Sequence, residues 1–206
     1  MNGAHSPVHI PDRLRSPWLR LLASWEFLLL GVGVCIFFLN VQASPYFLDP
    51  WNLSDATFNF TEKAMIAFAM ALVIISGEID LSVASIIALV STCMGYAVQQ
   101  GADTTTLVLV GIVAGAACGA FNGFLVAVMG LPSIVVTIGT LSLFRGIAYI
   151  VLGDQAYSGY PESFAFFGQG YVWWVITFEM VLFTIMALLF YVLLHRTSFG
   201  LSLIHI

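Results

Sequence analysis

The chain alternates between long apolar runs and short polar interruptions. Most runs are continuous for roughly 18–24 residues, which matches the ~20 residues that a helix needs to cross a hydrocarbon core about 30 Å thick. Strands are disfavoured because the runs do not alternate between apolar and polar positions. The pattern therefore predicts an all-α fold, a polytopic transmembrane helix bundle with about six spans. These spans cover residues 27–39 with an extension towards Phe47, a segment that begins between Ala56 and Ala64 and ends at Ser76, and residues 81–98, 106–129, 134–152 and 171–194.

Short polar residues mark the helix starts within this pattern. A hydrogen-bond acceptor directly before an apolar run is typical of an N-cap, and three residues fit: Asp80, Asp103 and Ser133. Amphipathic aromatic rings gather at membrane interfaces, and the last run opens with three: Tyr171, Trp173 and Trp174. The last span is therefore expected to begin at the membrane surface.

The basic residues predict the orientation of the chain. A polar tail, residues 1–24, carries Arg13, Arg15 and Arg20, and Arg196 follows the last span. Six spans place both ends on the same side, where these four arginines oppose Lys63 alone. Cytoplasmic loops carry an excess of Lys and Arg, so we expect both ends in the cytoplasm and loops 40–62, 99–105 and 153–170 outside.

The composition agrees with a membrane-embedded protein. Apolar residues make up 60% of the chain and charged residues 8%, with a mean hydropathy of +0.99. Soluble domains carry about 25% charged residues. Six scattered Lys and Arg residues form no phosphate-binding stripe, so nucleic-acid binding is disfavoured. The three cysteines lie inside apolar runs without metal or redox spacing and are interpreted as small buried hydrophobes: Cys35, Cys93 and Cys118.

No motif in the sequence proposes catalysis. The glycine-rich nucleotide-binding loop is absent from the sequence, and its only lysine, Lys63, has no glycine loop before it. The histidines are isolated near the ends, and no metal-ligand spacing or serine-nucleophile motif occurs. We therefore expect no enzyme activity, no metal and no cofactor in this chain.

A polar interruption at residues 77–80 separates the second span from the third. It carries Glu78 and Asp80. If the preceding helix begins at Ala64, it reaches only about 20 Å and the break lies inside the membrane. If it begins near Ala56, the break reaches the cytoplasmic surface, and Asp80 simply caps the next helix. Inside the membrane, broken helix ends survive only where they line a cavity.

A stripe of glycines follows one face of the fourth span. Gly111, Gly115, Gly119 and Gly123 form three consecutive G-x-x-x-G steps. Such a face lets another helix backbone approach closely, and the stripe therefore predicts tight helix packing. A sliding surface during transport is the alternative interpretation.

Three further polar residues lie deep within apolar runs. Arg145 and Glu179 each lie seven or eight residues from the outer end of a span, at about 10–12 Å depth. A charge there costs at least about 2.5 kcal/mol and normally faces a partner or water, so we expect an ion pair between them. Snorkelling of Arg145 to the interface is the alternative. Asn122, beside Gly123, is expected to seek a partner across the bundle.

The stretch from Gly77 to Ser85, GEIDLSVAS, resembles the ribose-type ABC permease family, whose members carry a G-x-I-D-L-S-V-G-S stretch. The resemblance covers about residues 25–200. It includes other positions in the family's order and spacing: Asn122-Gly123, Pro132, Thr137-Ile138-Gly139-Thr140, Arg145-Gly146 and the closing HRTSFG at residues 195–200. Two positions depart from the family: Glu78 replaces a small residue or glycine, and Ala84 replaces glycine. These departures are similar to the rhamnose-type branch, which uses two different permeases.

The resemblance implies a permease subunit that imports a monosaccharide or a related small polyol across the bacterial inner membrane. It implies three partners: a second permease subunit, identical or different, a cytoplasmic ATP-binding cassette protein and a periplasmic sugar-binding protein. The candidate residues along the translocation path are then Glu78, Asp80, Ser82, Asn122, Thr137, Arg145 and Glu179.

The family's long cytoplasmic loop and about four further spans do not follow Gly200. Residues 201–206 read instead as the translation of a sequencing-library adaptor, so we expect residues 25–200 to be the N-terminal part of a permease domain and 201–206 a non-native tail. Two other classes of protein remain. A secondary transporter or channel acting alone would use the intramembrane carboxylates, and a membrane anchor would use only the glycine face.

Overall fold

The computed structural model describes residues 24–204. The predicted cytoplasmic tail lies outside the described residues except for Ser24, as do residues 205–206 of the predicted non-native tail. The chain divides into two compact units, residues 1–53 and residues 54–206. In the first unit, helix α2 covers Trp25–Ala43, and the Ser24 hydroxyl accepts a hydrogen bond from the Phe27 amide at 3.3 Å.

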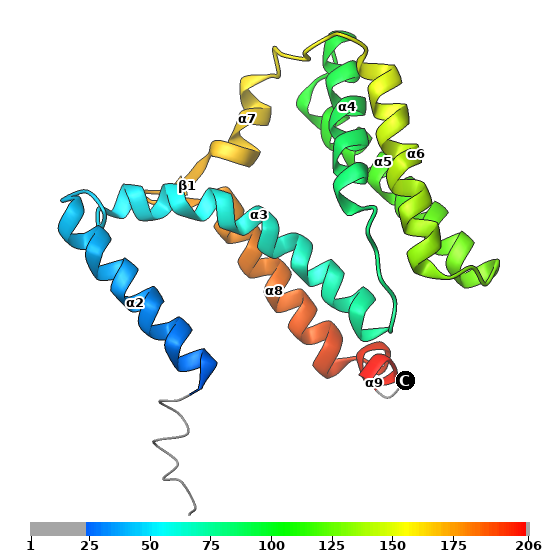
Figure 1. The fold of residues 1–206 in the computed structure, drawn as a ribbon. Coiled ribbons are helices and arrows are strands. Elements are labelled where there is room, and N and C mark those ends of the chain that lie inside the picture. The colour runs from blue at the N-terminus through cyan, green and yellow to red at the C-terminus, as the bar shows by residue number, and fades with distance from the viewer. Residues whose placement is uncertain (1–23, 205–206) are drawn as a thin grey trace, which may run out of the picture. The chain divides into compact units, whose positions relative to one another are not determined.

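The second unit contains most of the described chain, and helices dominate it (Figure 1). Helix α3 begins at the boundary between the units. The elements in chain order are α3 Pro50–Ile75, α4 Val83–Gln99, α5 Thr104–Gly123, the π-helical turn η1 Phe124–Val128, α6 Ser133–Leu152, α7 Glu162–Gln169, β1 Tyr171–Trp173, β2 Ile176–Thr177, α8 Phe178–Arg196 and α9 Ser198–Ile204.

Five helices among the described residues are long and apolar enough to cross a membrane. They are α2, α3, α5 together with η1, α6 and α8. Helix α4 is shorter, at 17 residues, and follows the break directly. The predicted fold class, an all-α polytopic membrane bundle, is confirmed, and the predicted third span corresponds to the short helix α4.

The predicted start of the sixth span, at Tyr171, is wrong. Residues 171–177 form the short antiparallel hairpin β1–β2, and α8 begins only at Phe178. Trp174, in the turn, has a φ of 43°. The side chains of this segment are apolar and aromatic, so they resemble the start of a membrane helix, but the backbone pairs with itself.

Helices α4, α5 and α6 run side by side and form the most closely packed part of the second unit (Figure 1). Their buried cluster contains Leu89 from α4, Cys118 from α5, and Phe144 and Ala148 from α6. Phe121 of α5 meets Phe144 edge to face, with ring centroids 6.3 Å apart. Because these side chains leave lipid or water as a group, they fix the three helices against one another.

Helices α3 and α8 are joined by aromatic stacking. Phe68 of α3 stacks on both Phe183 and Phe190 of α8, each with ring centroids 5.3 Å apart. The hairpin binds the first half of α3, because the Ser54 hydroxyl donates to the Val175 carbonyl oxygen at 2.6 Å.

Two further contacts fix this junction. The Tyr171 hydroxyl donates to Asp55 Oδ1 at 2.8 Å, and the Tyr171 and Phe58 rings meet edge to face. The hydrogen bond to Asp55 stabilises the protonated phenol and raises the pKa of Tyr171 above its ordinary value. The loop predicted at residues 153–170 therefore ends in an anchored element.

Only one of the three predicted N-caps is confirmed. Asp103 caps α5, and its carboxylate accepts from the Thr106 amide at 3.2 Å and from the Thr106 hydroxyl. The cap positions of α4 and α6 are Ser82 and Pro132, one or two residues away from the predicted Asp80 and Ser133. The Asp80 and Ser133 side chains bond instead to groups of the break.

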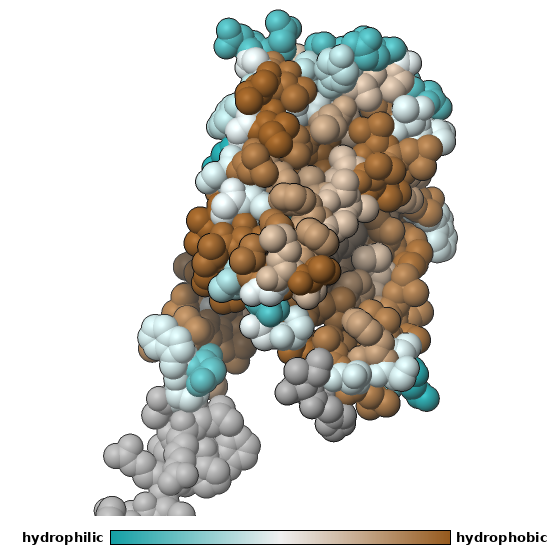
Figure 2. Space-filling model, turned by 90° about the vertical axis from the view of Figure 1, so that its right-hand side faces the viewer, coloured by the Kyte–Doolittle hydropathy of each residue, from teal (hydrophilic) through white to brown (hydrophobic). Residues whose placement is uncertain are grey.

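The surface has the character expected of a protein solvated by lipid. Hydrophobic colour covers most of the face drawn in Figure 2, and hydrophilic colour gathers towards its edges. Large apolar side chains are exposed along every candidate span; in α2, Trp25 is 69% exposed and Leu39 63%. Water does not solvate such a surface favourably, so these side chains face lipid or further protein.

Candidate functional site

The break between α3 and α4 begins with a glycine turn. The Gly77 amide donates to the Ile74 carbonyl oxygen and the Glu78 amide to the Val73 carbonyl oxygen, both at 3.0 Å. Gly77 has a φ of +82°, a conformation that residues with a Cβ rarely adopt. This pair of bonds is the Schellman motif, which satisfies the last carbonyls of α3 and ends the helix sharply.

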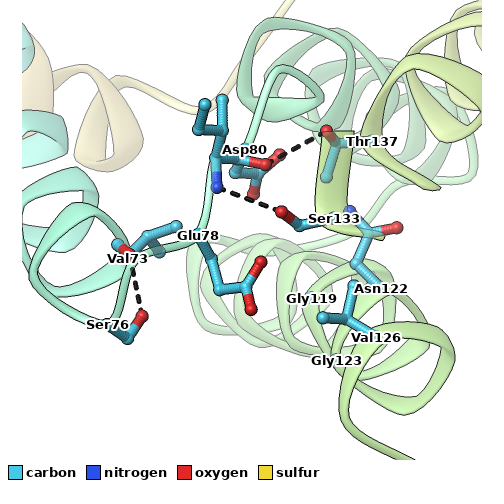
Figure 3. Close-up of a pocket in the computed structure, with 11 residues that line it drawn as sticks. Val73, Ser76, Glu78, Asp80, Gly119, Asn122, Gly123, Val126, Ser133 and Thr137 are labelled. Atoms are coloured by element: carbon cyan, nitrogen blue, oxygen red, sulfur yellow. Dashed lines mark hydrogen bonds between the residues drawn. The ribbon is translucent and has the colours of Figure 1, made fainter. Parts of the chain in front are cut away.

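Helix α6 holds the next residue of the break from both sides. The Ile79 amide donates to the Ser133 hydroxyl at 3.2 Å, and the Thr137 hydroxyl donates to the Ile79 carbonyl oxygen at 3.3 Å (Figure 3). Both side chains come from the first turns of α6. The irregular backbone therefore has hydrogen-bond partners that a helix would otherwise supply.

A chain of hydrogen bonds links α5 to the end of the break. Asn122 Nδ2 donates to the Ser82 hydroxyl at 2.8 Å, and that hydroxyl donates to Asp80 Oδ1 at 2.7 Å. Asp80 Oδ1 also accepts from the Ser82 amide at 2.8 Å. Because the Ser82 hydrogen goes to the carboxylate, its oxygen must accept from the amide of Asn122, which fixes the Asn122 side chain.

This arrangement leaves one buried acceptor unused. Asn122 is 7% exposed, and its Oδ1 has no hydrogen-bond partner among the described residues. The prediction that Asn122 seeks a partner across the bundle is confirmed for its nitrogen, which reaches Ser82 at the start of α4.

A cavity of about 240 Å³ opens beside the break. Glu78 extends from the break towards α5, and Asn122 and Ser133 lie on the other sides of the space (Figure 3). The floor is formed by Gly119, Gly123 and Val126, where the π-helical turn η1 continues α5. The cavity therefore combines a carboxylate, an amide and a hydroxyl with a floor that carries little side-chain bulk.

The two halves of the glycine stripe of α5 face different surroundings. A Cβ on Gly111 would lie 3.1 Å from Met94 Sδ, and one on Gly115 would lie 3.8 Å from Val90 Cγ2, so both face α4. A Cβ on Gly119 or Gly123 would meet nothing within 4 Å. The predicted packing face thus holds for the first half of the stripe, whereas the second half lines the cavity.

Arg145 and Glu179 are not brought together. Arg145 is exposed on α6, which packs against α4, whereas Glu179 is 8% exposed in the first turn of α8. No ion pair joins them within residues 24–204, and Glu179 Oε2 has no hydrogen-bond partner there. The predicted ion pair is therefore wrong: the hairpin occupies residues 171–177, so Glu179 lies in the first turn of α8 and not seven or eight residues into a span, and the two side chains do not meet.

Two contacts, one at the break and one near the other end of α4, were not predicted. Ser133 was expected to cap its own helix, but it bonds to the backbone of the break, and no local pattern indicates such a distant partner. Gly95 of α4 lies against Tyr157, whose Cδ2 would be 2.3 Å from a Cβ at that position. The small residue in an apolar helix was the only available signal of this close approach.

Metal binding finds no support in the described part of the chain, where no cluster of three or more His, Cys, Asp or Glu side chains occurs. The polar groups of the cavity are suited to hydrogen bonding. The site can hold and orient a polar solute.

Comparison with known proteins places the described helices in a wider group. Residues 52–206 match the family model described as a branched-chain amino acid transport system / permease component. The autoinducer 2 import system permease protein LsrD of Klebsiella pneumoniae is 32% identical over 188 residues, which cover 88% of this chain and 56% of that protein.

Two further relatives carry the same printed name. The protein from Enterobacter sp. strain 638 is 32% identical over 86% of this chain and 56% of its own length. The protein from Salmonella typhimurium is 29% identical over 90% of this chain and 57% of its own length. The chain thus spans about half the length of the curated relatives it matches, and no solved structure matches it.

Proposed function

Because the chain belongs to the family of branched-chain amino acid transport system permease components, we propose that it supplies membrane helices of an ABC importer permease. The solute is a monosaccharide or a related small polyol, moved across the bacterial inner membrane. The observation that carries the proposal is the family match over residues 52–206, which includes the break and the helices around it. The chain supplies the path, and a partner subunit hydrolyses ATP.

The lining of the cavity bears on the choice between two solute classes. The family description names branched-chain amino acids, whereas the relatives are named for autoinducer 2 import. The surface of this cavity is mainly apolar, as in most ligand pockets, but four hydrogen-bonding side chains line it: Glu78, Asp80, Asn122 and Ser133. These groups can bind the hydroxyls of a sugar, which favours a hydroxylated solute as the first class to test. Ribose, rhamnose and autoinducer 2 are the solutes to test first.

Helix lengths bear on the depth of the break. The whole of α3, 26 residues from Pro50, spans about 39 Å at 1.5 Å per residue, which exceeds the roughly 30 Å of the hydrocarbon core, and on that length the break reaches a membrane surface. Its uninterrupted apolar part, residues 64–75, spans only about 18 Å, and the 17 residues of α4 span about 26 Å. We propose the position that these shorter apolar lengths favour, within the membrane, where transporters form solute sites from interrupted helices.

The same proposal includes the partners and the orientation. A second permease subunit completes the path, an ATP-binding cassette protein acts in the cytoplasm, and a periplasmic binding protein delivers the solute. Both ends of the chain lie in the cytoplasm, because Arg13, Arg15, Arg20 and Arg196 then follow the positive-inside rule.

A transporter driven by an ion gradient is the second candidate. It is favoured by one observation, carboxylates beside apolar helices: Glu78 and Asp80 line the cavity, and Glu179 is buried in the first turn of α8. Intramembrane carboxylates in pumps and transporters carry protons or bind cations.

Reconstitution distinguishes the two candidates. The complete permease that contains this sequence is placed in liposomes with its ATPase and binding protein, and uptake of radiolabelled solute is measured. We expect uptake that requires ATP and the ATPase. Uptake that proceeds without the ATPase and follows an imposed proton or sodium gradient would refute the importer and support the second candidate.

A further inference from the structure

Most hydrogen-bond donors of the break cavity already have partners, whereas several of its acceptors have none in the part of the chain that the structure describes. Three donors are already engaged: the Ser76 hydroxyl with the Val73 carbonyl oxygen, the Thr137 hydroxyl with the Ile79 carbonyl oxygen, and Asn122 Nδ2 with Ser82. The Glu78 carboxylate, by contrast, has no hydrogen-bond partner among the described residues, nor does Asn122 Oδ1. The groups that remain are mostly acceptors, together with the O–H of Ser133 and the second N–H of Asn122 Nδ2.

The charge of the cavity has one sign. The eleven described residues that line it include Glu78 and Asp80 but no Lys, Arg or His. The other groups on the walls are neutral, and several are apolar, such as Val73 and Val126. Walls of low polarity weaken screening, so the potential of the carboxylates extends through the cavity.

We propose that the break cavity is a subsite that accepts hydrogen bonds from the hydroxyl groups of a neutral solute and excludes anions. A hydroxyl donates to a carboxylate in a short, strong bond, which Glu78 offers at the mouth of the break. An acid or a phosphorylated sugar meets the same carboxylate as a like charge. The volume of about 240 Å³ equals that of about eight water molecules at roughly 30 Å³ each, which is room for a small polyol.

This inference rests on the proposed function for the role of the solute as cargo, but the chemistry of the cavity can be tested without transport. Gly119 is a suitable position for a cysteine probe, because a Cβ there would have no atom within 4 Å. The chain, with its native cysteines replaced by alanine, receives Gly119→Cys and is labelled in membranes. Two methanethiosulfonate reagents of similar size are compared, the neutral 2-hydroxyethyl and the anionic 2-sulfonatoethyl compound.

Ser158→Cys, on the exposed loop before α7, is the control for the intrinsic rates of the two reagents. We expect the ratio of neutral to anionic rates to be on the order of tenfold higher at Gly119→Cys, the effect of two unit charges about 12 Å apart at an effective dielectric constant near 20. Glu78→Gln should remove most of this difference. The same ratio at both positions, or a ratio that Glu78→Gln leaves unchanged, would overturn the proposal.

A protection experiment tests the hydroxyl recognition. Ribitol, a neutral five-carbon polyol, should slow labelling at Gly119→Cys and leave Ser158→Cys unaffected, whereas ribonate, the matching acid, should protect neither. Protection by ribonate equal to that by ribitol, or no protection by ribitol, would overturn the proposal. The labelling experiment contains no ATPase. If the reconstituted permease showed no ATP-driven uptake, that would refute the importer function but would not change the labelling result.

Discussion

Ser82 connects the break to α5, and its replacement by alanine should destabilise the bundle more than a single hydrogen bond suggests. The side chain is fully buried, accepts from Asn122 and donates to Asp80. Ser82→Ala removes both bonds. Asp80 keeps the bond from the Ser82 amide, but Asn122 loses the only partner that the structure gives its amide group.

The magnitude follows from these two losses. A hydrogen bond to a charged group contributes about 1.5–3 kcal/mol, and a buried polar group left without a partner costs about 1–3 kcal/mol. Hydrogen bonds inside membrane proteins average a lower ~0.6 kcal/mol, because the unfolded chain also finds partners. We therefore expect Ser82→Ala to lower the free energy of unfolding by about 2–4 kcal/mol.

Ser85→Ala is the matched control. Ser85 is equally buried and lies one turn further along α4, but its hydroxyl donates only to the Ser82 carbonyl oxygen at 2.7 Å. That carbonyl also accepts the Ser85 and Ile86 amides, so it keeps partners after the substitution. The expected loss is about 0.6 kcal/mol.

The assay is unfolding of the purified chain from mild detergent into dodecyl sulfate, followed by circular dichroism. Asn122→Ala combined with Ser82→Ala should destabilise less than the sum of the single variants, because the two residues share one bond. Equal losses for Ser82→Ala and Ser85→Ala, or strict additivity in the cycle, would refute the hydrogen-bond chain as a structural connection.

Three further expectations follow from the same contacts. Gly95→Ala should lower the free energy of unfolding, because overpacking costs about 1–3 kcal/mol, whereas Gly139→Ala, with open space around it, should keep or raise it; equal effects in the same unfolding assay would contradict this. The hydroxyl and amide of Thr106 hold the pKa of Asp103 below its ordinary value of 3.8. The cap therefore stabilises α5 fully above pH 3.8 and loses its effect as the pH falls through the lower pKa of the folded state. Asp103→Asn should abolish this acid dependence in thermal melts. The losses of activity from Arg145→Ala and Glu179→Ala should add in the double variant, since the structure does not pair the two residues. Strong non-additivity between the two substitutions would instead support an ion pair.

The membrane helices could be predicted because hydrophobic length is a property of the sequence itself. Runs of about 20 apolar residues have few alternatives, and the break at Gly77 was visible as a polar interruption with a residue suited to a positive φ. The hairpin at residues 171–177 was not visible. Its aromatic and β-branched side chains suit a strand, an interface and a membrane helix equally well.

The candidate site was predicted in part. Glu78, Asp80, Asn122 and Thr137 do meet around the break, because the backbone freed by the break needs polar partners. The role of Ser133 and the separation of Arg145 from Glu179 could not be predicted in this way. The residue count that gave Glu179 its depth failed because the hairpin takes the residues before Phe178, and the choice of neighbouring helix depends on tertiary packing.

The central claim, that solute passes through the break cavity, is tested most directly by closing the cavity in the complete permease. Gly119→Leu places a side chain in the cavity, and Gly139→Leu places the same side chain on α6 outside its lining. Initial rates of ATP-driven solute uptake are compared at equal amounts of permease in the membrane. We expect Gly119→Leu to abolish uptake and Gly139→Leu to retain it, and full uptake with Gly119→Leu would contradict a path through the cavity.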